Sequence, residues 1–282
     1  MKRTVLGVAA LLASAGRLSA QGDCFPPPTS NEAKTFAIKS VALAYAPLSA
    51  PAPSAAGRVR LALETSYVPS VDDATATPTI CRPGKGPENA NLLAVMVRPR
   101  IALELPAGFV LDASWVPPVR VAEAKANLIG VALSRATVLT ETLVLSVRGH
   151  GTFGRIRAPI TCPEEALADP ESECYQGTES NDRYDPNIVG ADLALGLGRA
   201  GSRLRPYLGI GYNRLLPRFQ VNFTNAVGQL DERKVSVDLN RGVVFGGAAW
   251  AATDRVGLVG EVYAAPSDAV TGRLLVRASL GR

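Results

Sequence analysis

The chain has 282 residues, with 30 Lys and Arg, 25 Asp and Glu and a single histidine. Three of the basic residues lie within the first 20 positions, and the remaining 27 nearly balance the 25 acidic residues, so the pI of about 9.2 is no argument for nucleic-acid binding. One histidine excludes a zinc site built on two histidines. Beyond the N-terminus no apolar run approaches the roughly 18 residues of a spanning helix, so a mature chain that enters a membrane must do so as strands.

The N-terminus predicts a secretory signal peptide. Lys2 and Arg3 precede an apolar run that ends near Gly16, and the small residues Ser19 and Ala20 follow. We expect cleavage after Ala20 and export to the bacterial cell envelope. The expected divisions are a signal peptide over 1–20, an N-terminal segment over 21–56 and a β-barrel over 57–282.

The segment that follows differs in kind from the rest of the chain. Ser30 is a candidate N-cap, and residues 31–46 have a mixed period that fits either a helix or a strand. A linker rich in Pro, Ala and Ser then covers residues 47–56. We interpret residues 21–56 as a candidate lumen plug with its linker.

From Gly57 onward, apolar and polar residues alternate with the period of a strand. Leu61 and Leu63 belong to an apolar face, for example, while Arg60 and Glu64 belong to a charged one. About ten strands are predicted, with 8–12 open, at residues 57–68, 93–105, 109–117, 119–134, 141–160, 187–198, 204–225, 232–250, 256–264 and 270–280.

The connections differ in length. Long polar loops are predicted at 69–92 and 161–186, tight breaks near 106–108, 135–140, 199–203 and 252–254, and a bulge or bend at 215–217. Placing the long loops on one side puts both ends of the strand series on the other side, as in bacterial single-chain barrels. The fold class that we expect is an all-β, antiparallel transmembrane barrel, because lipid offers no partner to an open sheet edge. A soluble β-sandwich uses the same alternation and is the competing fold.

The four cysteines lie in turn-rich or acidic segments, which indicates disulfides in an exported protein. Four cysteines allow three pairings. Cys162 with Cys174 is the local choice, which leaves Cys24 for Cys81. Since Cys81 lies in a long outer loop and Gly57 begins on the inner side, this pairing would lead residues 25–56 through the lumen.

Few motifs predict chemistry. The run from Gly196 to Gly201 matches G-x-G-x-x-G, but a strand pattern follows it, so we interpret it as a hairpin turn. Carboxylates in the long loops are interpreted as solvated rather than as a calcium site. We expect no catalytic residue, no metal and no cofactor. Charged residues on the inward face of the predicted strands would either fill the lumen with salt bridges or line a selective passage. The candidate lumen-facing residues are Arg58, Arg60, Glu64, Arg98, Arg100, Glu104, Arg148, His150, Arg218 and Asp238.

The whole arrangement resembles bacterial outer-membrane β-barrel proteins as a broad class. The run Asn31-Glu32-Ala33 also resembles the Asn-Pro-Ala run in the N-terminal hatch of the long-chain fatty-acid transporter family. That resemblance implies a lumen plug and a hydrophobic cargo.

Three functions follow from these observations. The first is a non-enzymatic outer-membrane barrel that is porin-like, binds or passes small or amphipathic solutes, or stabilises the envelope. The second is a lipid-acting barrel hydrolase that uses His150, and the third is a soluble exported β-sandwich that binds a ligand. The expected partners are outer-membrane lipid, such solutes and, during biogenesis, the barrel-assembly machinery, with no nucleic acid.

Overall fold

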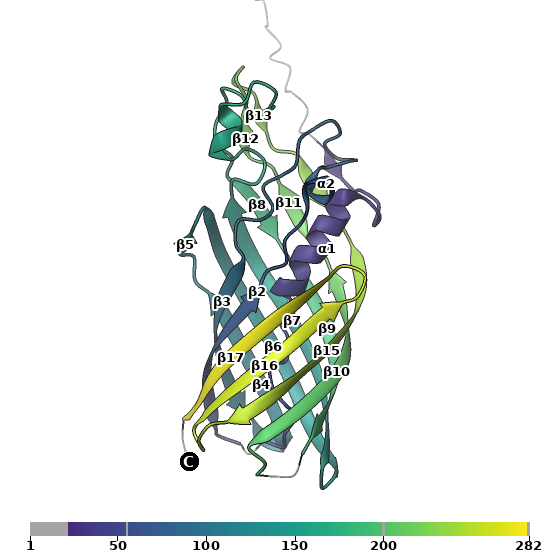
Figure 1. Cartoon of the computed structure of the whole chain (residues 1–282), viewed down its shortest axis with the longest axis vertical. Coiled ribbons are helices and arrows are strands. Elements are labelled where there is room, and N and C mark those ends of the chain that lie inside the picture. The colour runs from purple at the N-terminus through teal and green to yellow at the C-terminus, as the bar shows by residue number, and fades with distance from the viewer. Residues whose placement is uncertain (1–21, 55, 199–200, 281–282) are drawn as a thin grey trace, which may run out of the picture.

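The computed structural model describes residues 22–54, 56–198 and 201–280, and the predicted signal peptide lies outside them. Ten antiparallel strands close into a barrel (Figure 1). The last strand pairs with the first, from Arg273 opposite Ser66 to Leu280 opposite Val59. This closure excludes the open edges of a sandwich. The barrel strands are β2 (Val59–Tyr67), β3 (Val95–Glu104), β4 (Phe109–Val116), β6 (Ala124–Thr140), β7 (Leu143–Ala158), β9 (Ile188–Leu197), β10 (Leu204–Leu215), β15 (Leu239–Ala251), β16 (Val256–Ala265) and β17 (Ala269–Leu280).

Two parts of the predicted strand pattern are wrong in detail. The break expected at 135–140 is strand, because β6 runs to Thr140 and the turn needs only the two residues before β7. The strands predicted at 204–225 and 232–250 each leave the barrel wall at their outer part. A bulge or bend was predicted at 215–217, and β10 ends there, at Leu215.

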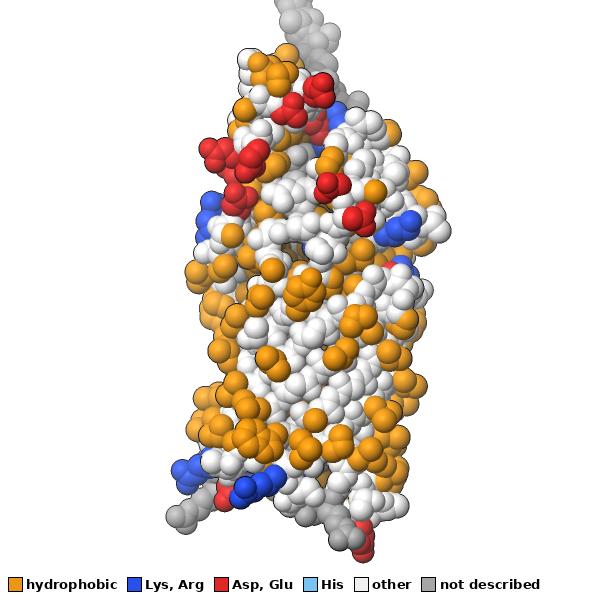
Figure 2. Space-filling view, in the orientation of Figure 1, with side chains coloured by type: hydrophobic (Ala, Val, Ile, Leu, Met, Phe, Trp, Pro, Cys, Tyr) orange, Lys and Arg blue, Asp and Glu red, His pale blue; other side chains and the backbone are white. Residues whose placement is uncertain are grey.

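The barrel has an apolar outside and a charged inside. In β3 the exposed residues Val95, Val97 and Ile101 alternate with buried Arg98 and Arg100. The apolar side chains cover the barrel wall in Figure 2, and charged side chains gather toward its two ends. Exposed aromatic residues include Tyr67, Trp115, Tyr212 and Trp250. This distribution is the reverse of that in a water-soluble protein and fits a lipid surrounding.

Beyond the wall, the sheet continues as an outer extension. It is formed by β8 (Asp182–Asp185), β11 (Arg218–Gln220), β14 (Lys234–Ser236) and the short β1 (Asp23–Cys24), which follow β7 in that order. A hairpin of β12 (Phe223–Thr224) and β13 (Leu230–Asp231), a 3-10 turn at Glu164–Leu167 and the hairpin strand β5 (Arg120–Val121) belong to the same end. Long loops therefore gather at one end, and short connections such as the 3-10 turn Pro106–Gly108 at the other.

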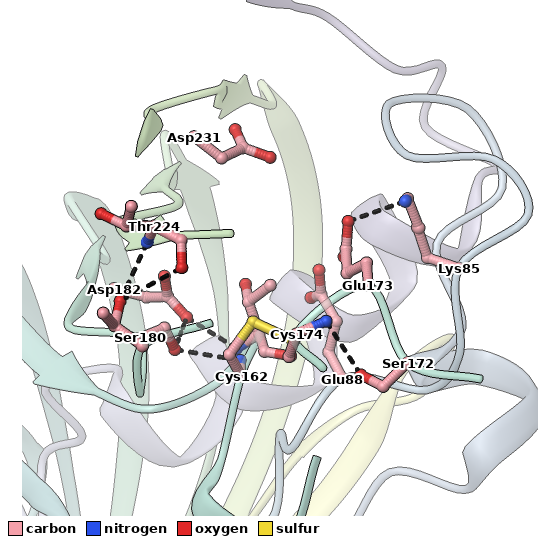
Figure 3. The surroundings of a disulfide bond; sticks show 12 residues. Lys85, Glu88, Cys162, Ser172, Glu173, Cys174, Ser180, Asp182, Thr224 and Asp231 are labelled. Atoms are coloured by element: carbon pink, nitrogen blue, oxygen red, sulfur yellow. Dashed lines mark hydrogen bonds and ion pairs between the residues drawn. A yellow bond between two sulfur atoms is a disulfide. The ribbon is translucent and has the colours of Figure 1, made fainter. Parts of the chain in front are cut away.

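A disulfide between Cys162 and Cys174 lies in the outer extension, within a polar network (Figure 3). Asp182 is its centre, because this carboxylate accepts hydrogen bonds from Thr161 N at 2.6 Å, Ser180 Oγ at 2.8 Å and Asn222 N at 2.8 Å. Burial nevertheless raises the pKa of Asp182. The network joins three loop segments into one cap.

The N-terminal segment forms α1 (Asn31–Leu43), and a second short helix, α2 (Asp73–Ala76), packs beside it. Ser30 is the N-cap, since its Oγ accepts from Ala33 N at 3.2 Å, and this cap resolves the ambiguous period as a helix. A disulfide joins Cys24 to Cys81. Among the residues that the structure describes, no helix is long and apolar enough to cross a membrane.

Candidate functional site

Residues 31–54, here called the lumen segment, are largely buried. The first part of α1 packs on the outer loop, and from Val41 onward the segment contacts the barrel wall from inside. The C-terminal end of α1 points into the barrel, where no basic residue of its own lies in the last turn. The unpaired carbonyls of this helix end carry a partial negative charge. Arginines from the barrel wall satisfy them.

Arg273 on β17 makes two of these contacts. Its Nη1 donates to the carbonyl of Ala44 at 2.7 Å and its Nη2 to that of Val41 at 2.6 Å. Arg98 on β3 donates to Leu43 O at 3.2 Å. Thr152 on β7 donates to the same carbonyl at 3.0 Å. The helix end is therefore held from three sides of the barrel.

A single buried carboxylate balances part of this positive charge. Glu64 on β2 is fully buried, 3.1 Å from Arg100 and 3.4 Å from Arg273, and it accepts from Ser66 Oγ at 2.9 Å. Arg98 is also fully buried nearby, and its positive charge attracts the same Glu64 carboxylate. Buried charges persist in proteins only when paired in this way.

Tyr45, just after α1, occupies the middle of the barrel with none of its surface exposed. Its hydroxyl donates to Asp112, and its ring lies 4.3 Å from the guanidinium of Arg100 and 5.2 Å from that of Arg148. Arg148 also donates to Tyr45 O at 2.5 Å and pairs with Asp192 at 2.7 Å. Cation–π contacts and hydrogen bonds thus fix the same residue.

The lumen segment is held again further along the chain. Leu48 N donates to Glu261 Oε2 at 3.1 Å, and Tyr207 Oη donates to the same oxygen at 2.8 Å. Pro51 packs close to Gly196 on β9, where an added Cβ would lie 3.1 Å from Pro51. These contacts place the lumen segment against the inside of the wall at each of these levels.

The structure places the candidate lumen residues in four different surroundings. Arg60 pairs with Glu104 at 2.9 Å near the inner end. Arg58 is exposed, just before β2. Arg218 and Asp238 are corrected: they pair at 3.1 Å at the outer extension and do not face the lumen. Inside the barrel lie Glu64, Arg98, Arg100, Glu104, Arg148 and His150.

Several lumen residues were not among the candidates. Arg273, Glu261, Tyr207 and Tyr263 are all buried inside the barrel. In the sequence they can be found because they fall on the alternate, inward-facing positions of β10, β16 and β17. Apolar residues at other inward positions of these strands made the alternation less clear.

The only histidine does not face lipid. The His150 side chain is fully buried, and its Nε2 lies 3.3 Å from Asp192 Oδ2, which Arg148 also contacts. This environment is part of the charged filling. Among the described residues, no group of three or more His, Cys, Asp or Glu side chains is arranged to hold a metal ion.

The barrel wall has a side opening between β3 and β4. Their pairing runs only from Glu104 opposite Val110 to Arg100 opposite Ser114, although both strands continue outward. The next position of β3 is Pro99, which has no N–H, and Pro117 and Pro118 follow the end of β4. The two strands keep their other neighbours, β2 and β6. The prolines therefore account for a local split in the wall.

A cavity of about 390 Å³ lies at this split. It is lined from outside the wall by Val95, Val97 and Val119, and from inside by Met96 and Leu128. Phe36 and Leu43 of α1, with Tyr184 and Phe219 of the outer extension, complete the apolar lining. We call this cavity the side chamber. It connects the lipid-facing surface with the upper lumen.

Two charged residues border the side chamber. Lys39 donates to Pro69 O at 2.8 Å and to Asn91 Oδ1 at 3.0 Å. Glu88 pairs with Arg82 at 2.6 Å, and burial raises the pKa of Glu88 to about 7. Both side chains are thus tied to the outer loops, and the remaining lining is predominantly apolar.

The closed wall and its apolar surface decide the class. The protein has the fold of an outer-membrane β-barrel. The resemblance to the fatty-acid transporter hatch is not confirmed. In this chain Glu32 accepts from Ile80 N and Cys81 N, each at 2.8 Å, and so binds α1 to the outer loop. Despite burial, these hydrogen bonds hold the pKa of Glu32 below its usual range.

Comparisons of structure give similar proteins of low identity. Ail, the attachment invasion locus protein of Yersinia pestis, is 9% identical with a TM-score of 0.30, over 80% of this chain and 100% of Ail. Neisserial surface protein A is 12% identical with a TM-score of 0.27, over 79% and 98%. The Pseudomonas putida toluene transporter TodX is 9% identical with a TM-score of 0.31, over 79% and 67%. No family model and no curated protein sequence matches the chain.

Proposed function

We propose that this barrel binds a hydrophobic or amphipathic molecule, which enters the side chamber from the outer leaflet through the β3–β4 opening. The observation that supports it is the continuity of the chamber lining, from Val97 on the lipid side to Met96 and Leu128 on the lumen side. A volume of about 390 Å³ lies within the range of small-molecule pockets, about 300–1,000 Å³. The proposal is for binding without chemistry.

The filled lumen argues against a simple porin. Tyr45 and the arginines around it occupy the middle of the barrel, so passage of the bound molecule to the inner side would require the lumen segment to move. The hydrolase alternative has no support from the position of His150, because its side chain is enclosed on the lumen side. A role that is purely structural would leave the side chamber unexplained.

The test fills the chamber. Ala126 lines it from β6, where Ala126→Phe would add a ring without removing a polar contact. The matched control is Val131→Phe, which adds a ring on the lipid-facing side of the same strand. Purified protein in detergent would be titrated with N-phenyl-1-naphthylamine, an aromatic hydrophobe whose fluorescence rises on binding, with medium-chain alcohols as competitors.

We expect saturable binding to the unmodified protein and to Val131→Phe. Ala126→Phe should bind at least about tenfold more weakly, since a filled pocket loses most of the apolar area that the ligand covers. Equal binding by both variants, with both folded, would overturn the proposal.

A further inference from the structure

A row of like charges crosses the outward face of the sheet at its outer end. Arg120 on β5 lies opposite Lys125 on β6, Lys125 opposite Arg157 on β7, and Arg157 opposite Arg183 on β8. These four side chains share one face, because the pairing is directly cross-strand. We call them the basic row.

Such an arrangement is unfavourable by itself. Directly opposed side chains in an antiparallel sheet have Cβ atoms about 4.5–5.5 Å apart, and like charges at these positions repel. Arg183 is partly balanced by Asp185, which it contacts at 2.8 Å and which Arg155 also contacts at 3.4 Å. Within the described residues, no ion pair includes Arg120, Lys125 or Arg157, and all three are exposed.

Carboxylates are present nearby but do not neutralise the row. The basic row lines a hollow of about 1,070 Å³ on the outer wall. Glu123, in the turn between β5 and β6, and Glu179 also line this hollow. Asp185 is shared between two arginines. The hollow therefore presents an excess of positive charge to whatever lies against the outer wall.

The row stands directly above the lipid-facing surface. On β6, Lys125 and Asn127 occupy the same face as exposed Ile129 and Val131, and on β7 Arg157 continues the face of exposed Phe153. Lys125 lies four residues beyond Ile129, about 13 Å along a strand. The row therefore follows the outer end of the apolar face, next to which a polar headgroup layer would lie. In Figure 2, basic side chains occupy the edge of the molecule at the level of β5, above the apolar wall.

We infer that the basic row is a binding site for the phosphate groups of a phosphorylated outer-leaflet glycolipid. The continuity of the row with the lipid-facing wall selects a lipid rather than a dissolved ion, and the opposed cations match an anion with more than one charge. Phosphate oxygens between the guanidinium and ammonium groups would convert their mutual repulsion into attraction. This inference does not depend on the side chamber.

The test compares two triple variants of equal charge. Arg120→Gln, Lys125→Gln and Arg157→Gln remove three cations of the row. The control, Arg58→Gln, Arg203→Gln and Arg255→Gln, removes three exposed arginines near the inner end. Each detergent-solubilised protein would be titrated with a bisphosphorylated glycolipid and with the same lipid after enzymatic dephosphorylation. Heat-modifiable gel mobility checks that each variant is folded.

We expect the row variant to bind the phosphorylated lipid about 100-fold more weakly, as three cations at an anionic surface imply, and with a smaller salt dependence. The control should stay within about twofold of the unmodified protein. The site is not what we infer if the two triple variants bind alike, or if dephosphorylation changes nothing. Displacement of the lipid by equimolar inorganic phosphate would also overturn it, since the row would then be a free-anion site.

Discussion

Arg273 donates to the carbonyl of Ala44 at 2.7 Å, although the two residues lie 229 positions apart in the sequence. The bond joins the last barrel strand to the segment that precedes the first one. Because Arg273 also contacts Glu64 on β2, one side chain links the closing seam of the barrel to the lumen segment. Closing the barrel and filling it are therefore coupled.

Replacement of Arg273 should test this coupling. Arg273→Met removes two hydrogen bonds to the end of α1 and one charge beside buried Glu64, so we expect a loss of about 3–5 kcal/mol, the usual cost of breaking a buried pair. Urea unfolding in lipid vesicles measures it. Arg277→Met, on the same strand but without these contacts to α1, is the control. Similar losses in both variants would contradict the coupling.

Tyr45 should keep the lumen closed. Tyr45→Ala removes a fully buried ring that contacts Arg100 and Arg148, and we expect a cost of about 3–5 kcal/mol together with the appearance of ion conductance in planar bilayers. The unmodified protein should conduct no more than a protein-free bilayer. Tyr67→Ala, on the lipid-facing surface, should leave conductance unchanged. A large conductance in the unmodified protein would show that the lumen segment does not close the barrel.

Alternation in the sequence was sufficient to predict the barrel and nearly all of its strands, because a wall between lipid and a charged interior imposes a period of two on every strand. The same signal could not show where the wall ends. Residues 218–220 and 234–236 alternate as the wall does, yet they form β11 and β14 of the outer extension. Alternation shows that a strand has one polar and one apolar face. It does not show whether that strand lies inside the hydrocarbon layer or beyond it.

The composition of the lumen was less predictable. Glu64 and Arg98 are visible as inward charges on neighbouring strands, but the approach of Arg273 to Glu64 depends on the register across the closing seam. That register is a property of the whole barrel. The side opening did have a local signal, since Pro99 and Pro117 cannot extend the β3–β4 pairing.

The Cys24–Cys81 disulfide should hold the lumen segment from its outer end. It closes a loop with a sequence separation of 57, so the chain-entropy model gives about 4 kcal/mol of stabilisation. In Cys24→Ser/Cys81→Ser we expect faster hydrogen exchange in α1, with little change in the barrel strands. Cys162→Ser/Cys174→Ser removes the other disulfide, which closes a separate loop, and is the control. Unchanged exchange in α1 would show that the barrel contacts alone hold the helix.

Glu88 should make the outer loops sensitive to pH. Burial raises the pKa of Glu88 from 4.5 to about 7, so its contribution to stability is fully present below pH 4.5 and is lost as the pH rises through 7. Between pH 4.5 and 8 we expect a fall of up to about 3 kcal/mol. Asp182 has a raised pKa as well and Glu32 a lowered one, so the informative quantity is the difference from a variant.

Glu88→Gln supplies that difference. The amide can still accept from Arg82 but does not ionise, so the variant should lose less stability than the unmodified protein over the same pH range. Melting curves at half-unit pH steps, supported by hydrogen exchange of residues 76–88, would measure it. Asp73→Asn, at an exposed position in α2, is the matched control and should follow the unmodified protein. Parallel pH profiles for Glu88→Gln and the unmodified protein would mean that Glu88 ionises in the folded loops as it does in water.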